Sequence, residues 1–355
     1  MPNYPLYEKL CNYELLEKSY KQTQIGPRKY RQEAILYDMV KERNLLRLYN
    51  SLKDGTYRPG EYIRFYVYEP KRRLISAPKI RDKIVQFACH LVLKDVYDKV
   101  YISTTYACLE GRGAHKAVAK VQHNMRLCQW RYGDGWILKM DIRKFFYSIN
   151  RNILKQILRK KIKDEKFLNL LFMILDSSPE GEKGIPLGNV TSQDFANLYL
   201  NEVDQFAKRF LGIKWYVRYM DDIIIVVPTK EEAQNALEKI DWFVREKLDI
   251  ELNEKTKIFP IEQGVNAYGF KIFTTHRLVR NSSKAAMKRR MKAMDRKYKN
   301  GELSLNRVQL GVNSWLGHAR HSNSYNLSKK IFEKYDYIEV EHKDYKFGNG
   351  KDGTL

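Results

Sequence analysis

The sequence has few cysteines and no long apolar run, and both shortages narrow the kind of protein it can be. Its four cysteines, Cys11, Cys89, Cys108 and Cys128, are widely spaced, without the CxxC pairs or Cys/His clusters that bind zinc. They are most simply free thiols in a reducing cytosol. No uncharged run approaches membrane-spanning length, and residues 1–5 lack the basic and apolar regions of a signal peptide. We therefore expect a cytoplasmic protein without a membrane partner.

Acidic residues are also in short supply. The 355 residues include 65 Lys and Arg but only 42 Asp and Glu, a formal net charge of +23. Such an excess favours a polyanionic partner, because cations that contact phosphates release counterions. An anionic membrane surface also fits this charge, but a nucleic acid is favoured. Most of the 25 tyrosines are expected to fill half-buried surfaces, and others can stack on bases.

Two adjacent acids, Asp221 and Asp222, interrupt an otherwise apolar stretch. They follow Tyr219 and Met220, and strand-like β-branched and aromatic residues flank the four on both sides. The pattern predicts a hairpin over 215–227 with two carboxylates at its tip. Ionised carboxylates next to buried strands are costly unless a cation compensates them. The alternative for this pair is an ordinary polar turn.

A third acid, Asp141, ends the apolar run 136–140. By itself it is most simply a strand-end cap. Together with the Asp pair, it gives three carboxylates on neighbouring strands, which can hold two Mg²⁺ ions about 3.5–4 Å apart for in-line nucleotidyl transfer. Asp141 and Asp221 would bind the ions most directly, the backbone carbonyl of Ile142 would be a further ligand, and Asp222 would support or share an ion. Mn²⁺ is an alternative to Mg²⁺.

The YxDD motif, Asp141 and their order resemble a bacterial reverse transcriptase of the group II intron type over most of residues 60–335. The resemblance implies an RNA-directed DNA polymerase with an α+β right-hand fold, in which an antiparallel palm sheet carries the acids. It predicts five segments: an N-terminal helical extension (1–60), fingers (61–135), a palm (136–275, with a helical insertion near 151–180), a helical thumb (276–336) and a tail (337–355), of which 343–355 is expected to be disordered.

The same resemblance assigns a nucleotide site. Phe146, five residues after Asp141, would be the gate that rejects a 2′-hydroxyl, although a core Phe is the alternative. Arg73 and Lys71 of the basic turn 70–73 would contact the triphosphate, unless they form only a solvated charge run. Lys255 could protonate pyrophosphate. The other predicted nucleotide contacts are Ile142, the backbone amides of Lys144 and Phe145, Leu187, Gly188 and Gln193.

The segment 184–193 indicates which subfamily of reverse transcriptases the chain resembles. Most relatives have Gln-Gly followed by Ser-Pro, whereas this chain has Leu187-Gly188 and Ser192-Gln193. The LGxxxSQ form resembles the enzymes of diversity-generating retroelements, which misincorporate opposite template adenine. The side chain of Leu187 has no hydrogen-bond donor or acceptor. The nascent base pair would then be held more by shape than by polar contacts, and discrimination against mispaired nucleotides should fall. A neutral packing change is the alternative.

The resemblance also implies partners and a primer–template surface. The partners are template RNA, the RNA–DNA hybrid, dNTPs and a small basic oligomeric accessory protein. The chain ends soon after the predicted thumb, as in the compact diversity-generating enzymes. Two other functions remain open: a group II-like or defence-associated reverse transcriptase of ordinary fidelity, and an RNA-binding scaffold without activity. The predicted primer and template contacts are Arg112, His115, Tyr268, Gly269 and Phe270.

Overall fold

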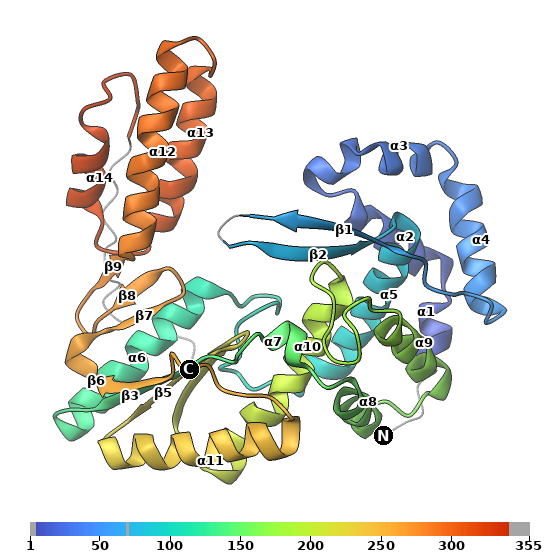
Figure 1. Cartoon of the computed structure of the whole chain (residues 1–355), viewed down its shortest axis with the longest axis horizontal. Helices are drawn as coiled ribbons and strands as arrows, with labels where there is room; N and C mark the ends of the chain where they lie inside the picture. Colours follow the sequence, from blue (N-terminus) through green and yellow to red (C-terminus); the bar gives the residue numbers. More distant parts are fainter. Residues whose placement is uncertain (1–4, 69–70, 341–355) are drawn as a thin grey trace. The chain divides into compact units, whose positions relative to one another are not determined.

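The computed structural model describes residues 5–68 and 71–340, in which helices alternate with short strands to give a mixed α+β chain (Figure 1). The predicted disordered tail, 343–355, therefore lies outside the described residues. The chain divides into two compact units. The first comprises Met1–Gly113, Lys139–Ile224 and Gln234–Lys257, and the second comprises Ala114–Leu138, Ile225–Ala233 and Ile258–Leu355.

The first unit begins with helices that pack on α5 (Ile80–Tyr97). The prediction of one amphipathic helix over 31–53 is wrong, because Val40 leaves helical geometry at φ −132° and ψ 36° and so separates two helices. Apolar spacing did not reveal the break, since both halves carry the same helical period. The helices before α5 are α1 (Leu6–Leu10), α2 (Tyr13–Thr23), α3 (Gln32–Asp38) and α4 (Lys41–Lys53), with a short 3-10 helix at Gly26–Tyr30.

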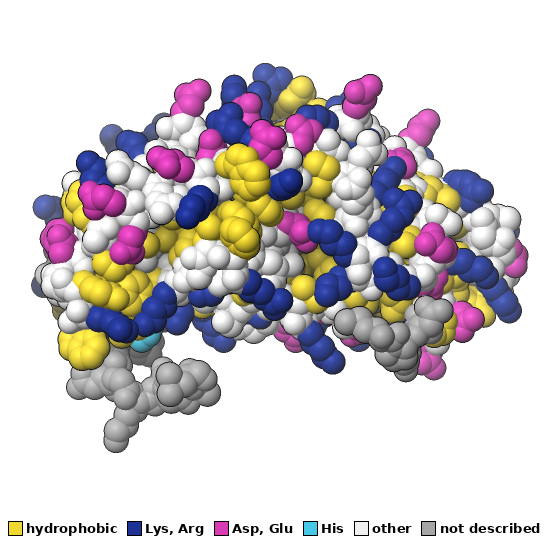
Figure 2. Space-filling view, turned by 90° about the horizontal axis from the view of Figure 1, so that it is seen from below, with side chains coloured by type: hydrophobic (Ala, Val, Ile, Leu, Met, Phe, Trp, Pro, Cys, Tyr) yellow, Lys and Arg dark blue, Asp and Glu magenta, His cyan; other side chains and the backbone are white. Residues whose placement is uncertain are grey.

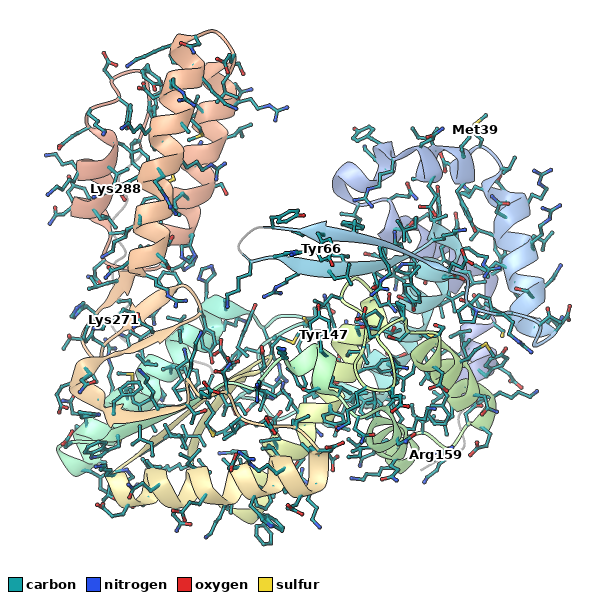
Figure 3. All side chains as sticks on the ribbon, viewed as in Figure 1. Met39, Tyr66, Tyr147, Arg159, Lys271 and Lys288 are labelled. Atoms are coloured by element: carbon teal, nitrogen blue, oxygen red, sulfur yellow. The ribbon has the colours of Figure 1, made fainter. Side chains whose placement is uncertain are left out.

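An antiparallel ribbon follows, formed by β1 (Tyr62–Val67) and β2 (Arg73–Pro78), with Tyr62 opposite Pro78 and Val67 opposite Arg73. It confirms the predicted strand, which continues after the basic turn. Most of β1 is exposed on both faces, and Figure 3 labels Tyr66 on this ribbon. The backbone N–H of Ser76 donates to the Leu187 carbonyl at 2.8 Å, which fixes the ribbon to the segment before α10.

Four α-helices follow strand β3 (Trp136–Met140) along the chain. The predicted helix over 151–176 is two helices, because Asp164 begins a new one by accepting a hydrogen bond from the Phe167 backbone N–H at 3.1 Å. The helix predicted over 192–211 begins slightly earlier and ends in a π-helical turn, Phe206–Phe210. The four helices are α7 (Phe145–Ser148), α8 (Arg151–Lys161), α9 (Glu165–Asp176) and α10 (Val190–Gln205).

A four-stranded sheet has the order β4-β5-β3-β6. A two-residue turn joins β4 to β5, which confirms the predicted hairpin. Helix α11 (Lys230–Leu248) matches its prediction over 230–248. Strand β5 is buried from its second residue onward, so its apolar run forms part of the core. The strands are β3 (Trp136–Met140), β4 (Trp215–Tyr219), β5 (Asp222–Val227) and β6 (Lys257–Pro260).

In its described residues, the second unit contains a small sheet, four α-helices and a short 3-10 helix at Ile261–Gln263. Helix α6 (Ala114–Tyr132) was not predicted, although Ala117, Val121 and Met125 follow a helical period and are buried. The single strand predicted over 267–273 is a hairpin, since a turn separates β7 (Val265–Ala267) from β8 (Phe270–Ile272). Strand β9 (Arg277–Val279) follows, and then α12 (Asn281–Lys299), α13 (Leu305–Ala319) and α14 (Tyr325–Phe332).

Helices α12, α13 and α14 enclose a core of their own, to which Met291, Val312 and Phe332 contribute. Figure 3 labels Lys288 on α12, one of the many cations of this basic segment. On the face drawn in Figure 2, Lys and Arg side chains are spread across the surface. Among the described residues, no helix is both long and apolar enough to cross a membrane.

Candidate active site

The turn between β4 and β5 carries the first two predicted acids. Its first residue, Met220, has φ +52°, a left-handed conformation that is uncommon outside glycine. Two-residue hairpin turns need a positive φ at this position, and a non-glycine residue there costs on the order of 1–3 kcal/mol. Such strain persists only where neighbouring contacts impose it. The turn therefore holds Asp221, its second residue, in a fixed place.

Asp141 and Asp221 lie together. Their carboxyl groups are close enough for a hydrogen bond between them. Burial, and next the charge of Asp141, raise the pKa of Asp221 to about 6. Burial, and next the charge of Asp222, raise the pKa of Asp141. The chain thus concentrates negative charge in a partly desolvated place, which is an arrangement that a cation would stabilise.

Asp222 is oriented differently. Its Oδ1 lies 3.8 Å from the Nζ of Lys139 on the neighbouring strand β3, while its charge is still close enough to raise the pKa of Asp221. Across residues 5–68 and 71–340, no three Asp, Glu, His or Cys side chains are grouped closely enough to hold one metal ion. The expected convergence of three carboxylates is therefore seen for two.

The donor set of this pair fits Mg²⁺. Two carboxylates and the backbone carbonyl of Ile142, the residue after Asp141, are the hard oxygen ligands that Mg²⁺ prefers. Asn253 holds Asp141 by two hydrogen bonds: its Nδ2 donates to Asp141 Oδ2 at 3.2 Å, and its backbone N–H donates to the Asp141 carbonyl at 2.7 Å. The residues that would hold a metal ion are therefore Asp141, Asp221 and Ile142.

A cavity of about 1040 Å³ in the first unit opens over this pair. Asp141 and Asp221 line it, and so do all of the predicted nucleotide-binding residues except Lys255. Those residues come from the β1–β2 ribbon, from the segment around α7 and from the start of α10, as Figure 3 illustrates with Tyr66 on the ribbon and Tyr147 on α7. The residues concerned are Lys71, Arg73, Ile142, Lys144, Phe145, Phe146, Leu187, Gly188 and Gln193.

The position of residue 188 in the cavity wall requires a glycine. Its φ is +126°, and a Cβ at this residue would lie 2.8 Å from the carbonyl oxygen of Ser76. Any side chain here would push the β2 strand away from the segment before α10. The backbone carbonyl of the neighbouring Leu187 accepts a hydrogen bond from the Ser76 N–H. Leu187 and Gly188 are therefore held by β2 as part of one wall.

Two residues near the carboxylates were not predicted from the sequence. The predicted residue Lys255 does not line the cavity; its backbone N–H donates to Asn253 Oδ1 at 3.1 Å, and its contact with pyrophosphate stays a prediction. Asn253 was missed, although it lies two residues before Lys255. Arg218 was also missed, because an Arg inside an apolar strand was taken as part of the strand. It is buried and contacts the turn.

Arg112, the predicted template contact in the first unit, binds backbone carbonyls of its own loop. Its Nη1 donates to the carbonyl oxygens of Ile102 and Thr105 at 2.6 and 2.7 Å. These bonds tie together the loop that precedes α6. Contact between Arg112 and a template stays a prediction.

The other predicted primer and template residues lie in the second unit. Tyr268 and Gly269 form the β7–β8 turn with φ +51° and +93°, and a Cβ at Gly269 would lie 2.8 Å from the ring of His318. His318 stacks on Phe270 with ring centroids 4.4 Å apart. His115 of α6 stacks on His321 at 3.5 Å. The structure thus brings the predicted residues His115, Tyr268, Gly269 and Phe270 to one end of this unit's small sheet, beside α13.

With the paired carboxylates, the cavity and the α+β architecture described, the class of protein follows. The family described as "Reverse transcriptase (RNA-dependent DNA polymerase)" matches residues 68–272, more than half of the chain. The chain therefore belongs to the reverse transcriptase family, and its fold is the right-hand polymerase fold of that family. The predictions of fold class and of polymerase family are confirmed.

The chain is also similar to individual proteins. The chain is 26% identical over 279 residues to Protein YkfC of Escherichia coli, covering 67% of this chain and 71% of that protein. It is 25% identical over 308 residues to the Group II intron-encoded protein LtrA of Lactococcus lactis, covering 66% of this chain and half (50%) of LtrA. Among solved structures, telomerase from Candida albicans has a TM-score of 0.48 at 11% identity, covering 81% of this chain and 58% of that one.

Proposed function

We propose that this chain copies an RNA template into cDNA at the cavity that contains Asp141 and Asp221. The observation that carries the proposal is the coincidence of two features. Two carboxylates with raised pKa values lie together, and most of the residues predicted to bind the nucleotide line the cavity around them. A bound pair of Mg²⁺ ions would supply activation of the primer 3′-hydroxyl and stabilisation of the leaving pyrophosphate.

The protein's own residues would bind and orient the substrates. Lys71 and Arg73 bring positive charge to the cavity from the ribbon, where a triphosphate would need it. Phe146 presents a ring to the same space and would exclude a ribose 2′-hydroxyl. The partners in this proposal are dNTPs, template RNA and the RNA–DNA hybrid. The fingers (61–135), palm (136–275) and thumb (276–336) would hold them, as in the right-hand arrangement of the family.

Primer extension tests the proposal directly. Purified protein, Mg²⁺, poly(rA) and oligo(dT) should incorporate dTTP, and Asp221→Asn should abolish incorporation while RNA binding stays largely intact. Asp241→Asn on α11, a surface carboxylate paired with Arg245 at 2.9 Å, is the matched control and should extend normally. No incorporation by the native protein would refute the polymerase function and favour an RNA-binding scaffold. Activity in Asp221→Asn would refute the metal assignment.

Within this activity, we propose that synthesis is error-prone at template adenines, as in a diversity-generating retroelement. The support is the side chain of Leu187, which lines the cavity where relatives have a Gln that can hydrogen-bond. A small basic oligomeric accessory protein would then be a further partner. Sequencing of cDNA made on a defined RNA gives the error spectrum, and an even spectrum without excess at adenines would refute the proposal.

The second candidate is a group II intron-type enzyme of ordinary fidelity. The similarity to LtrA, a Group II intron-encoded protein, favours it. Both candidates predict extension on poly(rA), so only the error spectrum separates them. A low and unbiased error rate in the native protein would establish the second candidate.

A further inference from the structure

A buried ion pair lies directly behind the turn that carries Asp221. Arg218 of β4 and Asp204 of α10 are both fully buried, with their side chains 0% exposed. The guanidinium binds the carboxylate with two bonds, Nε to Oδ1 and Nη2 to Oδ2, each 2.7 Å long. Burying two charges costs several kcal/mol per ion before their attraction offsets it, so such a pair is weak evidence for stability alone. Its retention calls for another explanation.

The third nitrogen of the same guanidinium reaches the turn. Arg218 Nη1 donates to the carbonyl oxygen of Met220 at 3.1 Å and to Asn197 Oδ1 at 3.2 Å. Met220 is the residue with the left-handed φ, and its carbonyl belongs to the peptide bond that leads into Asp221. A charged donor on this carbonyl therefore fixes the orientation of that peptide and with it the start of the Asp221 side chain.

Arg218 is itself held on every side. The other contacts to Asp204 come from Tyr216 Oη at 2.6 Å and Thr105 Oγ1 at 2.7 Å. The Arg218 backbone N–H donates to the Thr104 carbonyl, and its carbonyl accepts from the Tyr106 N–H, both at 3.0 Å. The two direct bonds to Asp204 and the two backbone bonds of Arg218 are enough to leave the guanidinium little freedom to follow a turn that moves.

The bonds to Asn197 and Asp204 connect the turn to helix α10. That helix begins in the wall of the nucleotide cavity, where Val190 and Gln193 line it. A single side chain thus links the carboxylate turn to the helix that forms part of the nucleotide site. Lys cannot replace this function, because its single ammonium cannot make the planar two-bond contact to Asp204 and bind the Met220 carbonyl at the same time.

We propose that Arg218 is a positioning residue for the active site: held by Asp204, it fixes the Met220–Asp221 peptide against α10 and so sets the geometry in which Asp221 binds metal. The proposal rests on the proposed function, in which Asp221 is a metal ligand. Arg218 itself is shielded from the cavity and touches neither substrate nor metal. Its loss should affect the catalytic step and metal binding more than nucleotide binding.

Two kinds of variant separate positioning from stability. Arg218→Lys keeps the charge opposite Asp204 but loses the bond geometry. Arg218→Met combined with Asp204→Leu removes both charges together, a replacement that is often neutral or stabilising. The controls, Tyr216→Phe and Thr105→Val, each remove one bond to Asp204 and leave the Arg218–Met220 bond in place.

The measurements are thermal unfolding, kcat and KM for dTTP on poly(rA)/oligo(dT), and the rise of the unfolding temperature with Mg²⁺ in the absence of substrate. We expect both Arg218 variants to lose about 100-fold in kcat, the effect of a misplacement of roughly 1 Å, with KM little changed and the Mg²⁺-dependent rise reduced. The controls should keep kcat and the Mg²⁺ response within a few fold, even where their unfolding temperature falls.

The proposal is overturned if both Arg218 variants keep the kcat and Mg²⁺ response of the controls, or if the controls lose as much as they do. Should the double variant fail to fold, Arg218→Lys and the two controls decide the question. Failure of the proposed function is a separate result. A native protein that does not extend a primer refutes polymerase activity, whereas the Mg²⁺-dependent unfolding of native protein and variants still tests whether Arg218 positions Asp221.

Discussion

The raised pKa of Asp221 predicts that the metal-free protein becomes less stable as pH rises. Burial and the neighbouring Asp141 raise this pKa from 3.8 to about 6. In the unfolded chain the Asp221 carboxyl ionises near its ordinary pKa of 3.8. Between pH 3.8 and about 6, the folded protein therefore holds a proton that the unfolded chain has released. The stabilisation is complete below pH 3.8 and is lost as pH rises through about 6.

The magnitude follows from the difference in pKa. A difference of one in pKa is worth about 1.4 kcal/mol, so the rise to about 6 corresponds to a free energy on the order of 3 kcal/mol. The quantity belongs to the pair, because Asp141 and Asp221 titrate together. Asp221→Asn cannot ionise and removes this dependence. The variant should therefore unfold at a higher urea concentration than the native protein above pH 7, and at a similar one near pH 4.

The assay is urea unfolding in EDTA at pH 4.5 and pH 8, on the native protein, Asp221→Asn and the surface control Asp241→Asn. The native protein and the control should show the same pH dependence between the two pH values. Asp221→Asn should lose about 2 kcal/mol less than they do, because about 1 kcal/mol of the effect has already developed at pH 4.5. Mg²⁺ added at pH 8 should stabilise the native protein, by about 2.7 kcal/mol at a concentration of 100 Kd. Equal pH dependence in all three proteins would refute the electrostatic account of the carboxylate pair.

Three other substitutions in the cavity wall have defined outcomes. Phe146→Ala should admit ribonucleotides and lower the dNTP/NTP preference in single-nucleotide incorporation, and an unchanged preference would remove Phe146 as the gate. Leu187→Gln should lower misincorporation opposite template adenine, whereas equal cDNA error spectra would contradict the role given to this side chain. Gly188→Ala should destabilise the protein by about 1–3 kcal/mol through its positive φ and its contact with Ser76, and urea unfolding with native-like stability would show that the wall adapts.

The acids and the hairpin could be found from the sequence because their signals are local. An Asp pair between two apolar strands specifies a turn with carboxylates, and α11 has one continuous apolar face. The helices that were misjudged failed for a related reason. Val40 and Asp164 interrupt helices at points where the apolar period continues. A prediction based only on apolar spacing therefore extends one helix across each break.

Two features of the site depended on contacts between different elements of the fold. Asn253 reaches Asp141 from 112 positions away, and Arg218 reaches Asp204 within a core that no local pattern indicates. The direction of Asp222 toward Lys139 likewise depends on the order of strands in the sheet.

The sequence by itself determined the family and predicted the acids and the nucleotide-binding residues, because the order of short motifs along the chain carries that information. Only the tertiary structure decided which carboxylates share a place, which side chains hold the turn and which predicted contacts reach the cavity. The physical reason is that pKa shifts, buried ion pairs and cavity walls arise from segments brought together by packing, and separation along the chain does not determine distance in the folded protein.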